Sequence, residues 1–152
     1  PDFRWKRCDI KSLNLMANVM AKMDAEKKGN QEAIFVDDHG FITEGAGSAF
    51  FMVFKETKKL VTHPLGHEIL PSITREFVRQ LAGQTDLIFS PEQTKLEDAL
   101  KADEMFMAVT TQDIVPIVQF DGTKIADGKP GIYTLKLQQL FQYLYHKHAT
   151  RV

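Results

Sequence analysis

The sequence predicts one domain of the α/β class, and three observations support this prediction. Short stretches that alternate apolar and polar residues, as strands do, are interspersed with stretches whose apolar residues recur every three or four positions, as in helices. The two kinds of stretch are mixed along the chain rather than separated into halves, which is typical of α/β domains. The chain has 152 residues, 43% of them apolar, so it is long enough to enclose one core.

Two elements are expected before residue 30. Residues 3–8 alternate with a period of two and predict a strand. From Leu13 the apolar spacing becomes helical, and Gly29 follows the lysine-rich end of this stretch as a C-terminal stop. Lys11 is therefore predicted to lie at a junction between a strand and a helix. The apolar residues at helical spacing are Leu15, Val19, Met20 and Met23.

The remaining elements follow from the same patterns, and antiparallel hairpins are expected among them. Strands are predicted over residues 32–36, 41–43, 48–55, 59–62, 86–89, 105–109 and 115–120. Helices are predicted from Leu70-Pro71-Ser72-Ile73-Thr74 toward Leu81, over residues 94–102 and over residues 133–145. Turns are predicted at 38–40, at the hairpin tip 56–58, at 121–122 and at 127–131. These turns lie within one domain, so no domain boundary is expected.

Composition excludes several classes of function. Nineteen basic and twenty acidic side chains give a net charge of -1, which argues against a surface for nucleic acid or anionic membrane. Apolar runs such as residues 49–54 are far too short to span a bilayer. The single cysteine, Cys8, cannot form an internal disulfide and suits a reducing compartment. The chain is therefore expected to be soluble and cytoplasmic.

Three motifs occur in one register and carry a family resemblance. They are Arg4-Trp5-Lys6-Arg7-Cys8-Asp9-Ile10-Lys11-Ser12-Leu13-Asn14-Leu15, Thr43-Glu44-Gly45 and Ile69-Leu70-Pro71-Ser72-Ile73-Thr74-Arg75. Together they resemble the D-amino acid aminotransferase branch of the fold-type IV enzymes, which depend on pyridoxal 5'-phosphate (PLP), and the resemblance runs from Arg4 to about Phe141. It implies a pseudo-barrel of mixed strands with surrounding helices, a homodimer, and a smaller N-terminal domain in the same polypeptide. Because Lys11 lies so near the first residue, residues 1–152 are expected to be the C-terminal PLP-binding domain alone.

Lys11 is the residue that forms the Schiff base with the cofactor in this resemblance. A lysine attacks an aldehyde only as the neutral amine, so its ordinary pKa of about 10.4 must be lowered by burial or by neighbouring positive charge. The predicted strand–helix junction would supply burial, and Arg4, Lys6 or Arg7 would supply charge. The alternative is a solvated surface lysine, which is the common fate of an isolated lysine. The eight-residue match over residues 7–14 favours the catalytic role.

The resemblance assigns the other contacts of the cofactor. Glu44 lies beside the pyridine nitrogen and keeps it protonated, which makes the cofactor an electron sink. Ile73 and Thr74 bind the phosphate at the start of a helix, where unpaired N–H groups and the helix dipole favour anions. Leu70 packs against the ring, and Thr110 is a further phosphate contact. The alternatives are an exposed strand-end carboxylate for Glu44, a helix N-cap at Ser72 or Thr74, and ordinary strand preference for Thr110.

The other reactive side chains give weaker signals. The five histidines have no spacing to acidic residues that predicts a metal site, and His63 and His67, which flank a Pro-Leu-Gly loop, are expected to be exposed. Cys8, between Arg7 and Asp9, is either an activated thiol or, more commonly for a lone cysteine in a strand, a small buried apolar residue. No metal is expected.

The chain also departs from the family pattern. After Gly45 the family usually has three hydroxyl residues and an asparagine, but this chain has Ala46-Gly47-Ser48-Ala49, while Ser72 replaces a glycine and Val109 a hydroxyl residue. The predicted activity is transamination, the transfer of an amino group between an amino acid and a 2-oxo acid. The amino acid is expected to be a D-amino acid or a related amine. Two alternatives stay open: a lyase of the aminodeoxychorismate lyase type, which eliminates pyruvate, and a non-catalytic module that keeps the fold.

Overall fold

The computed structural model describes residue 2 and residues 4–148, and its largest element is a five-stranded mixed sheet. In spatial order its strands are β5 (Ile88–Pro91), β4 (Lys59–Thr62), β3 (Ala49–Phe54), β7 (Glu104–Val109) and β8 (Asp113–Ile117). All neighbours are antiparallel except β4 and β5, which are parallel. The predicted hairpin of residues 48–55 and 59–62 is confirmed, with Phe54 opposite Lys59.

A smaller sheet and a hairpin complete the strands. The antiparallel three-stranded sheet contains β1 (Ile34–Val36), β2 (Phe41–Gly45) and β6 (Thr94–Lys95), and β9 (Gln119–Phe120) pairs with β10 (Thr123–Lys124). The chain passes from one sheet to the other at the β2–β3 and β5–β6 connections and between β6 and β7. Mixed strands with helices around them confirm the predicted α/β class.

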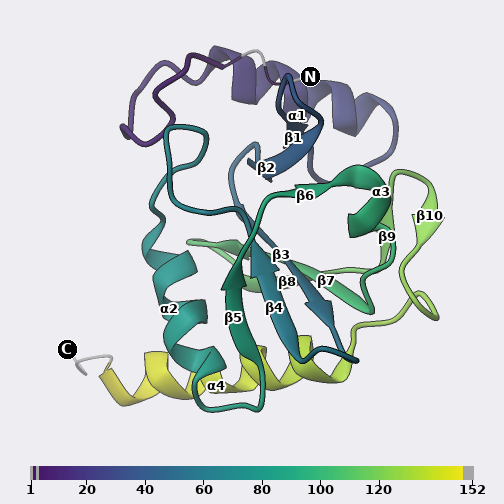
Figure 1. Cartoon of the computed structure of the whole chain (residues 1–152). Helices are drawn as coiled ribbons and strands as arrows, with labels where there is room; N and C mark the ends of the chain where they lie inside the picture. The colour runs from purple at the N-terminus through teal and green to yellow at the C-terminus, as the bar shows by residue number, and fades with distance from the viewer. Residues whose placement is uncertain (1, 3, 149–152) are drawn as a thin grey trace.

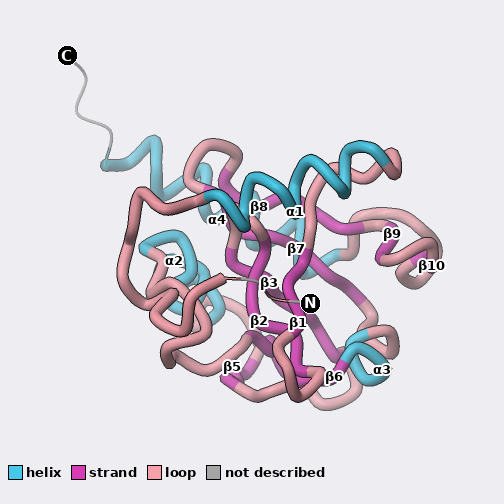
Figure 2. Tube along the Cα trace, turned by 90° about the horizontal axis from the view of Figure 1, so that it is seen from above, coloured by secondary structure: helices cyan, strands magenta, loops and turns pink. Residues whose placement is uncertain are grey.

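The helices lie at opposite ends of the molecule (Figure 1). α1 (Met16–Lys27) lies at one end, and α4 (Ile132–His148) lies at the other, where α2 (Ile73–Ala82) packs against it. Figure 2 shows from above how α1 crosses over the strands. The short α3 (Leu96–Ala99) follows β6 directly. Within the described residues, no helix combines the length and hydrophobicity needed to cross a bilayer.

Both faces of the five-stranded sheet are buried. Side chains of a strand point alternately to its two faces, and on β3 the side chains of both faces are buried in hydrophobic clusters. Phe51 and Val53 pack into the cluster that includes Val78 of α2 and Leu137 of α4. Phe50 and Met52 pack into a second cluster with residues of the smaller sheet and α3. β3 is therefore a rigid central strand, and the turn that precedes it is a well-fixed place for functional groups.

A buried carboxylate fixes the start of α4. Glu104 of β7 is 2% exposed and accepts hydrogen bonds from the backbone N–H groups of Tyr133 (3.3 Å) and Thr134 (2.8 Å). An acidic group here satisfies N–H donors that the helix leaves unpaired and complements the helix dipole. Gly131 is required beside it, because a Cβ at this position would lie 1.9 Å from Cδ of Glu104.

Several element predictions need correction. The strand predicted over residues 115–120 divides into β8 and β9, which belong to different sheets. Residues 4–15 form bends and a turn instead of a strand, and Phe3 lies outside the described residues. The reason is local: Ile10 N–H closes a turn on the Arg7 carbonyl, and the N–H of Cys8 bonds to the loop residue His67 rather than to a neighbouring strand. Residues 94–102 begin with the strand β6 before the helix α3, and the strand predicted over residues 86–89 forms two residues later, as β5.

The apolar residues of α1 face solvent in the described chain. The helix begins at Met16, three residues later than the apolar spacing predicts, and it ends as predicted, with Gly29 at φ 78° just beyond its end. However, Ala25 is its buried residue, whereas Val19, Met20 and Met23 are 50%, 58% and 51% exposed. α1 is thus held to the domain by few contacts, and its apolar surface is available to another protein surface.

Candidate active site

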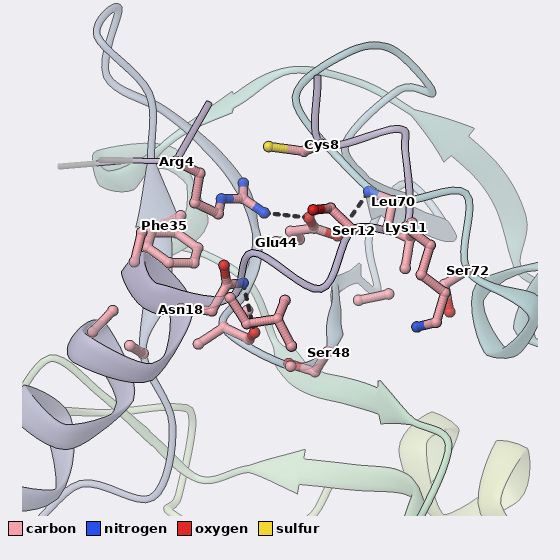
Figure 3. A pocket seen from close by; sticks show the side chains of 18 of the residues that line it. Arg4, Cys8, Lys11, Ser12, Asn18, Phe35, Glu44, Ser48, Leu70 and Ser72 are labelled. Carbon is pink, nitrogen blue, oxygen red and sulfur yellow. Dashed lines mark hydrogen bonds and ion pairs between the residues drawn. The ribbon is translucent and has the colours of Figure 1, made fainter. Parts of the chain in front are cut away.

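One cavity of about 990 Å³ lies between α1, the irregular segment before it and the ends of the sheet strands. Five of the six predicted site residues line it: Lys11, Glu44, Leu70, Thr74 and Thr110. The sixth, Ile73, does not, since its side chain is 76% exposed and points away from the core. These residues come from four separate parts of the sequence, which the fold brings to one place (Figure 3).

Lys11 lies in the irregular segment and not at the predicted strand–helix junction. Its side chain is exposed, because residues 4–8 form no strand and α1 does not begin until Met16. Figure 3 shows Lys11 beside Ser72 on the wall of the cavity. The burial that was expected to favour its neutral form is therefore not supplied by the described residues.

The three cations near Lys11 are each bound by a carboxylate. Arg4 pairs with Asp2 and Glu44, Lys6 with Asp38 at 2.9 Å, and Arg7 with Asp9 at 2.9 Å. The prediction that one of them acts directly on Lys11 is not supported, because each charge is already compensated. Asp9 also lies 3.3 Å from Nδ1 of His67. Within the described part of the chain, no carboxylate forms an ion pair with Lys11 itself.

Glu44 is a buried carboxylate, with 7% of its surface exposed, near the end of β2. One oxygen, Oε1, accepts a hydrogen bond from Nη1 of Arg4, and the other, Oε2, accepts from the backbone N–H of Leu70 at 3.1 Å. Burial raises the pKa of Glu44 above its ordinary value, while Arg4 and the Leu70 N–H act in the opposite direction. The alternative of an exposed strand-end glutamate is excluded.

Arg4 is the site residue whose partner the sequence did not indicate. Its guanidinium also donates to the carbonyl of Glu68 at 3.0 Å and lies 4.4 Å from the ring centre of Phe35. Burial lowers the pKa of Arg4, but the hydrogen bonds to Asp2 and Glu44 outweigh burial, so the pKa is above its ordinary value. Arg4 therefore stays charged and stabilises the ionised form of Glu44.

The N-terminus of α2 offers hydrogen-bond donors to the cavity. Ser72 is the N-cap: its Oγ accepts from the N–H of Arg75 at 3.3 Å and lies 2.7 Å from Oγ1 of Thr74, which is 7% exposed. Among the described residues, the N–H groups of Ile73 and Thr74 have no acceptor, as expected in the first turn of a helix. Such a terminus favours an anion. Ile73 can take part only through its backbone.

Two strand ends complete the cavity wall. Ala49 at the start of β3 is opposite Ala108 near the end of β7, so Thr110, just beyond β7, lies near the turn that leads from Gly45 into β3. In that turn, Asn18 of α1 donates from Nδ2 to the carbonyl of Ala46 at 2.8 Å. Ser48 Oγ is buried and has no hydrogen-bond partner among the described residues. The one hydroxyl kept in this part of the family pattern therefore faces the site with an unused donor.

Other candidate groups are excluded or corrected. His63 is 5% exposed, so the prediction of an exposed side chain is wrong for His63 and correct for His67. Burial raises the pKa of Cys8, whose Sγ lies 3.2 Å from the Trp5 carbonyl, so the activated-thiol alternative is not supported. Among the described residues, no cluster of His, Cys, Asp and Glu is arranged to hold a metal ion.

Comparison with known proteins identifies the family. The family described as Amino-transferase class IV matches residues 1–120. The chain belongs to the class IV aminotransferases. It is 39% identical over 141 residues to the D-alanine aminotransferase of Bacillus licheniformis and 38% identical over 149 residues to that of Staphylococcus epidermidis. These matches cover 93% and 97% of this chain but 49% and 51% of the relatives.

A solved class IV structure supports the fold. The branched-chain amino acid aminotransferase of Thermobaculum terrenum in its PLP form superposes with a TM-score of 0.86 at 31% identity, over 93% of this chain and 46% of that one. The class IV fold predicted from the motifs is thereby confirmed. The chain spans about half the length of the relatives it matches.

The ion pair between Arg4 and Glu44 leads to a prediction on pH dependence. Arg4→Met leaves Glu44 buried without its countercharge, so its pKa, already raised by burial, should rise further. A raised folded-state pKa means that the folded protein binds the proton more tightly, so stability is retained at low pH and lost as pH rises through the folded pKa. Denaturant unfolding of the full-length protein should show a loss of about 3 kcal/mol near pH 8 and less near pH 5.

The matched control is Lys6→Met, which also removes a cation from an ion pair with a carboxylate. The pair of Lys6 with Asp38 is exposed, whereas the pair of Arg4 with Glu44 is buried. This variant should leave the free energy of unfolding close to the wild-type value at either pH, because a solvated ion pair contributes little to stability. A pH-independent loss in Arg4→Met, or an equal loss in both variants, would contradict the coupling between Arg4 and Glu44.

Proposed function

We propose that this chain is the cofactor-binding domain of a PLP-dependent transaminase. The observation that carries the proposal is that one cavity brings together an amine from Lys11, a buried carboxylate from Glu44 and the donor-rich N-terminus of α2. One substrate would be an amino acid, specifically a D-amino acid or a related amine, and the other would be a 2-oxo acid. The relatives named above are aminotransferases, which favours this reaction over pyruvate elimination.

The donor set of the cavity fits PLP. The aldehyde of PLP requires an amine, which Lys11 offers, and the protonated pyridine nitrogen requires an anion, which Glu44 offers. The phosphate requires N–H and O–H donors, which the first turn of α2 and Thr110 offer. Ser48 Oγ adds a donor that has no acceptor among the described residues. Leu70 would pack against the ring while its N–H holds Glu44 in place.

Each residue then has a defined task. Bound PLP would supply an electron sink for the Cα of an amino acid substrate. Lys11 Nζ, which has no carboxylate partner among the described residues, removes the proton from that Cα as a general base. Glu44 would hold a proton on the pyridine nitrogen of PLP, and Arg4 keeps Glu44 ionised for this task.

Further parts of the proposal concern the whole protein. We propose that residues 1–152 form one domain, that an N-terminal domain of the same polypeptide completes the site, and that the protein is a homodimer. Support comes from the doubled length of the relatives and from the exposed apolar side chains of α1, with Leu13 beside them 99% exposed. Light scattering of the full-length protein that gives the monomer mass would remove the homodimer from the proposal.

A cytoplasmic location also belongs to the proposal. It is supported by the lone cysteine, Cys8, which suits a reducing compartment. Cell fractionation that finds the protein outside the cytoplasm would contradict it.

The first prediction concerns Lys11. When the full-length protein is incubated with PLP and reduced with borohydride, peptide mapping should place the label on Lys11, and Lys11→Ala should carry no label and no transaminase activity. Lys6→Ala is the control, since Lys6 is exposed and bound to Asp38, and it should be labelled as the wild type is. Label on another lysine, or activity of Lys11→Ala within about tenfold of wild type, would contradict the assignment, because tenfold corresponds to only ~1.4 kcal/mol of barrier.

The second prediction separates the electronic role of Glu44 from cofactor binding. Glu44→Gln keeps the size of the side chain and removes the charge, so PLP affinity should change by less than about tenfold, while the rate of Cα proton removal should fall by about a hundredfold or more. Single-turnover kinetics with deuterium at Cα measures this rate. The control is Glu68→Gln, whose side chain is exposed. Equal single-turnover rates for wild type and Glu44→Gln would remove Glu44 from the site.

Two assays separate the alternatives. Release of pyruvate by the full-length protein, without transfer of the amino group, would favour the lyase. Absence of any borohydride-reducible adduct in the wild type would favour the non-catalytic module.

A further inference from the structure

Arg75 is a buried charge with no ion pair in the described part of the chain. It is 4% exposed, although it lies on α2 only four residues from the exposed Arg79. The nearest acid on the helix, Glu76, is bound by Arg79 and Gln80. Burial lowers the pKa of Arg75. Because an unpaired buried cation destabilises the folded state, the contacts that hold it there call for a reason beyond packing.

Arg75 contacts both ends of one connection, with its guanidinium at the first end and its backbone N–H at the second. Nη2 donates to the carbonyl of His63, immediately after β4, at 3.1 Å. The guanidinium carbon Cζ lies 5.4 Å from the ring centre of Phe89 in β5. At the other end, the backbone N–H of Arg75 donates to Oγ of Ser72, the N-cap of α2. Arg75 therefore braces the segment that runs from residue 63 to residue 72.

This segment contacts three parts of the candidate site. The carbonyl of His67 accepts from the N–H of Cys8 at 2.8 Å, which ties it to the segment that carries Lys11. The N–H of Leu70 donates to Glu44 at 3.1 Å, and the hydroxyl of Ser72 contacts Thr74 at 2.7 Å. Residues 63–72 contain neither helix nor strand. Their path therefore depends on these contacts and on the anchors at both ends.

An arginine suits both anchors at once. Its planar guanidinium can donate to a carbonyl in its own plane while its face packs on an aromatic ring, whereas a lysine ammonium offers only a point charge on a flexible stem. The carbonyl of His63 lies just after β4, and the ring of Phe89 lies on β5, the parallel neighbour of β4, so a single guanidinium can reach both.

We propose that Arg75 is a positioning residue of the cofactor site: by holding the carbonyl of His63, it fixes the path of residues 63–72. It thereby sets where the N–H of Leu70 meets Glu44 and where Ser72 and Thr74 face the cavity. Arg75 acts through these residues and does not line the cavity. The cofactor part of this inference rests on the proposed function, whereas the effect on the segment does not.

The test uses the full-length protein and compares Arg75→Met and Arg75→Lys with wild type. Arg79→Met is the matched control, because Arg79 lies on the same helix, is exposed and, among the described residues, binds Glu76 in the preceding turn. Amide hydrogen exchange by mass spectrometry is measured without PLP, and PLP affinity is measured separately by fluorescence titration.

In Arg75→Met the amides of residues 65–72 should exchange about tenfold faster or more, the loss expected when a charge-assisted hydrogen bond is removed, while β3 and β7 keep their protection. PLP affinity should fall by about tenfold, and Arg75→Lys should give a smaller loss of the same kind. Arg79→Met should match wild type in both measurements.

Several outcomes would overturn the inference. Unchanged exchange over residues 65–72 in both variants, or faster exchange spread evenly over the whole domain, would show that Arg75 is only a core residue. If Arg75→Met does not fold, Arg75→Lys and Phe89→Leu must show the local effect, and its absence in both contradicts the proposal. If wild type does not bind PLP, the proposed function fails, but the exchange measured without PLP still decides the role of Arg75.

Discussion

The site depends on one buried carboxylate that is held from two sides. Glu44 accepts a hydrogen bond from Arg4 on one oxygen and from the backbone N–H of Leu70 on the other, and these partners are 40 and 26 residues away in sequence. A buried carboxylate without such partners would be strongly destabilising. The same two contacts fix the segment before Lys11 and the connection before α2 with respect to β2. The placement of Lys11 and of the N-terminus of α2 relative to β2 therefore depends on this arrangement.

The sheet provides a rigid base, and the segments between its strands carry most of the functional groups, so the positions of these groups are defined although the segments are irregular. β3 and β7 are buried on both faces and form a rigid base. Glu44 lies on β2, and the other functional groups lie on segments near the strand ends. Polar contacts tie these segments to one another, for example Asn18 to Ala46 and Cys8 to His67. Such segments are fixed only by cooperation, so the loss of one contact is expected to loosen its neighbours. The exposed apolar side of α1 marks where the domain lacks support of its own.

How much was predictable from sequence follows from the range of the contacts involved. The strand Lys59–Thr62 and the helix that begins after Ser72 are set by local alternation and by an N-cap, and both were predicted closely. The segment before Lys11 looked like a strand, but its charged side chains find carboxylates instead of a neighbouring strand. Local patterns do not predict the pairing of Arg4 with Glu44, because these residues lie 40 positions apart, nor the burial of His63, whose carbonyl contacts Arg75 of α2. Motif register supplied the site residues, and five of the six line one cavity.

A crystal structure of the full-length protein with bound PLP would test the central claim most directly. The account predicts continuous electron density from Lys11 Nζ to the cofactor, with the phosphate at the N–H groups of Ile73 and Thr74. It also predicts that the pyridine nitrogen lies within hydrogen-bond distance of Glu44, while Arg4 keeps its contact with the same carboxylate. A cofactor attached to another lysine, or a pyridine nitrogen that faces away from Glu44, would contradict the account.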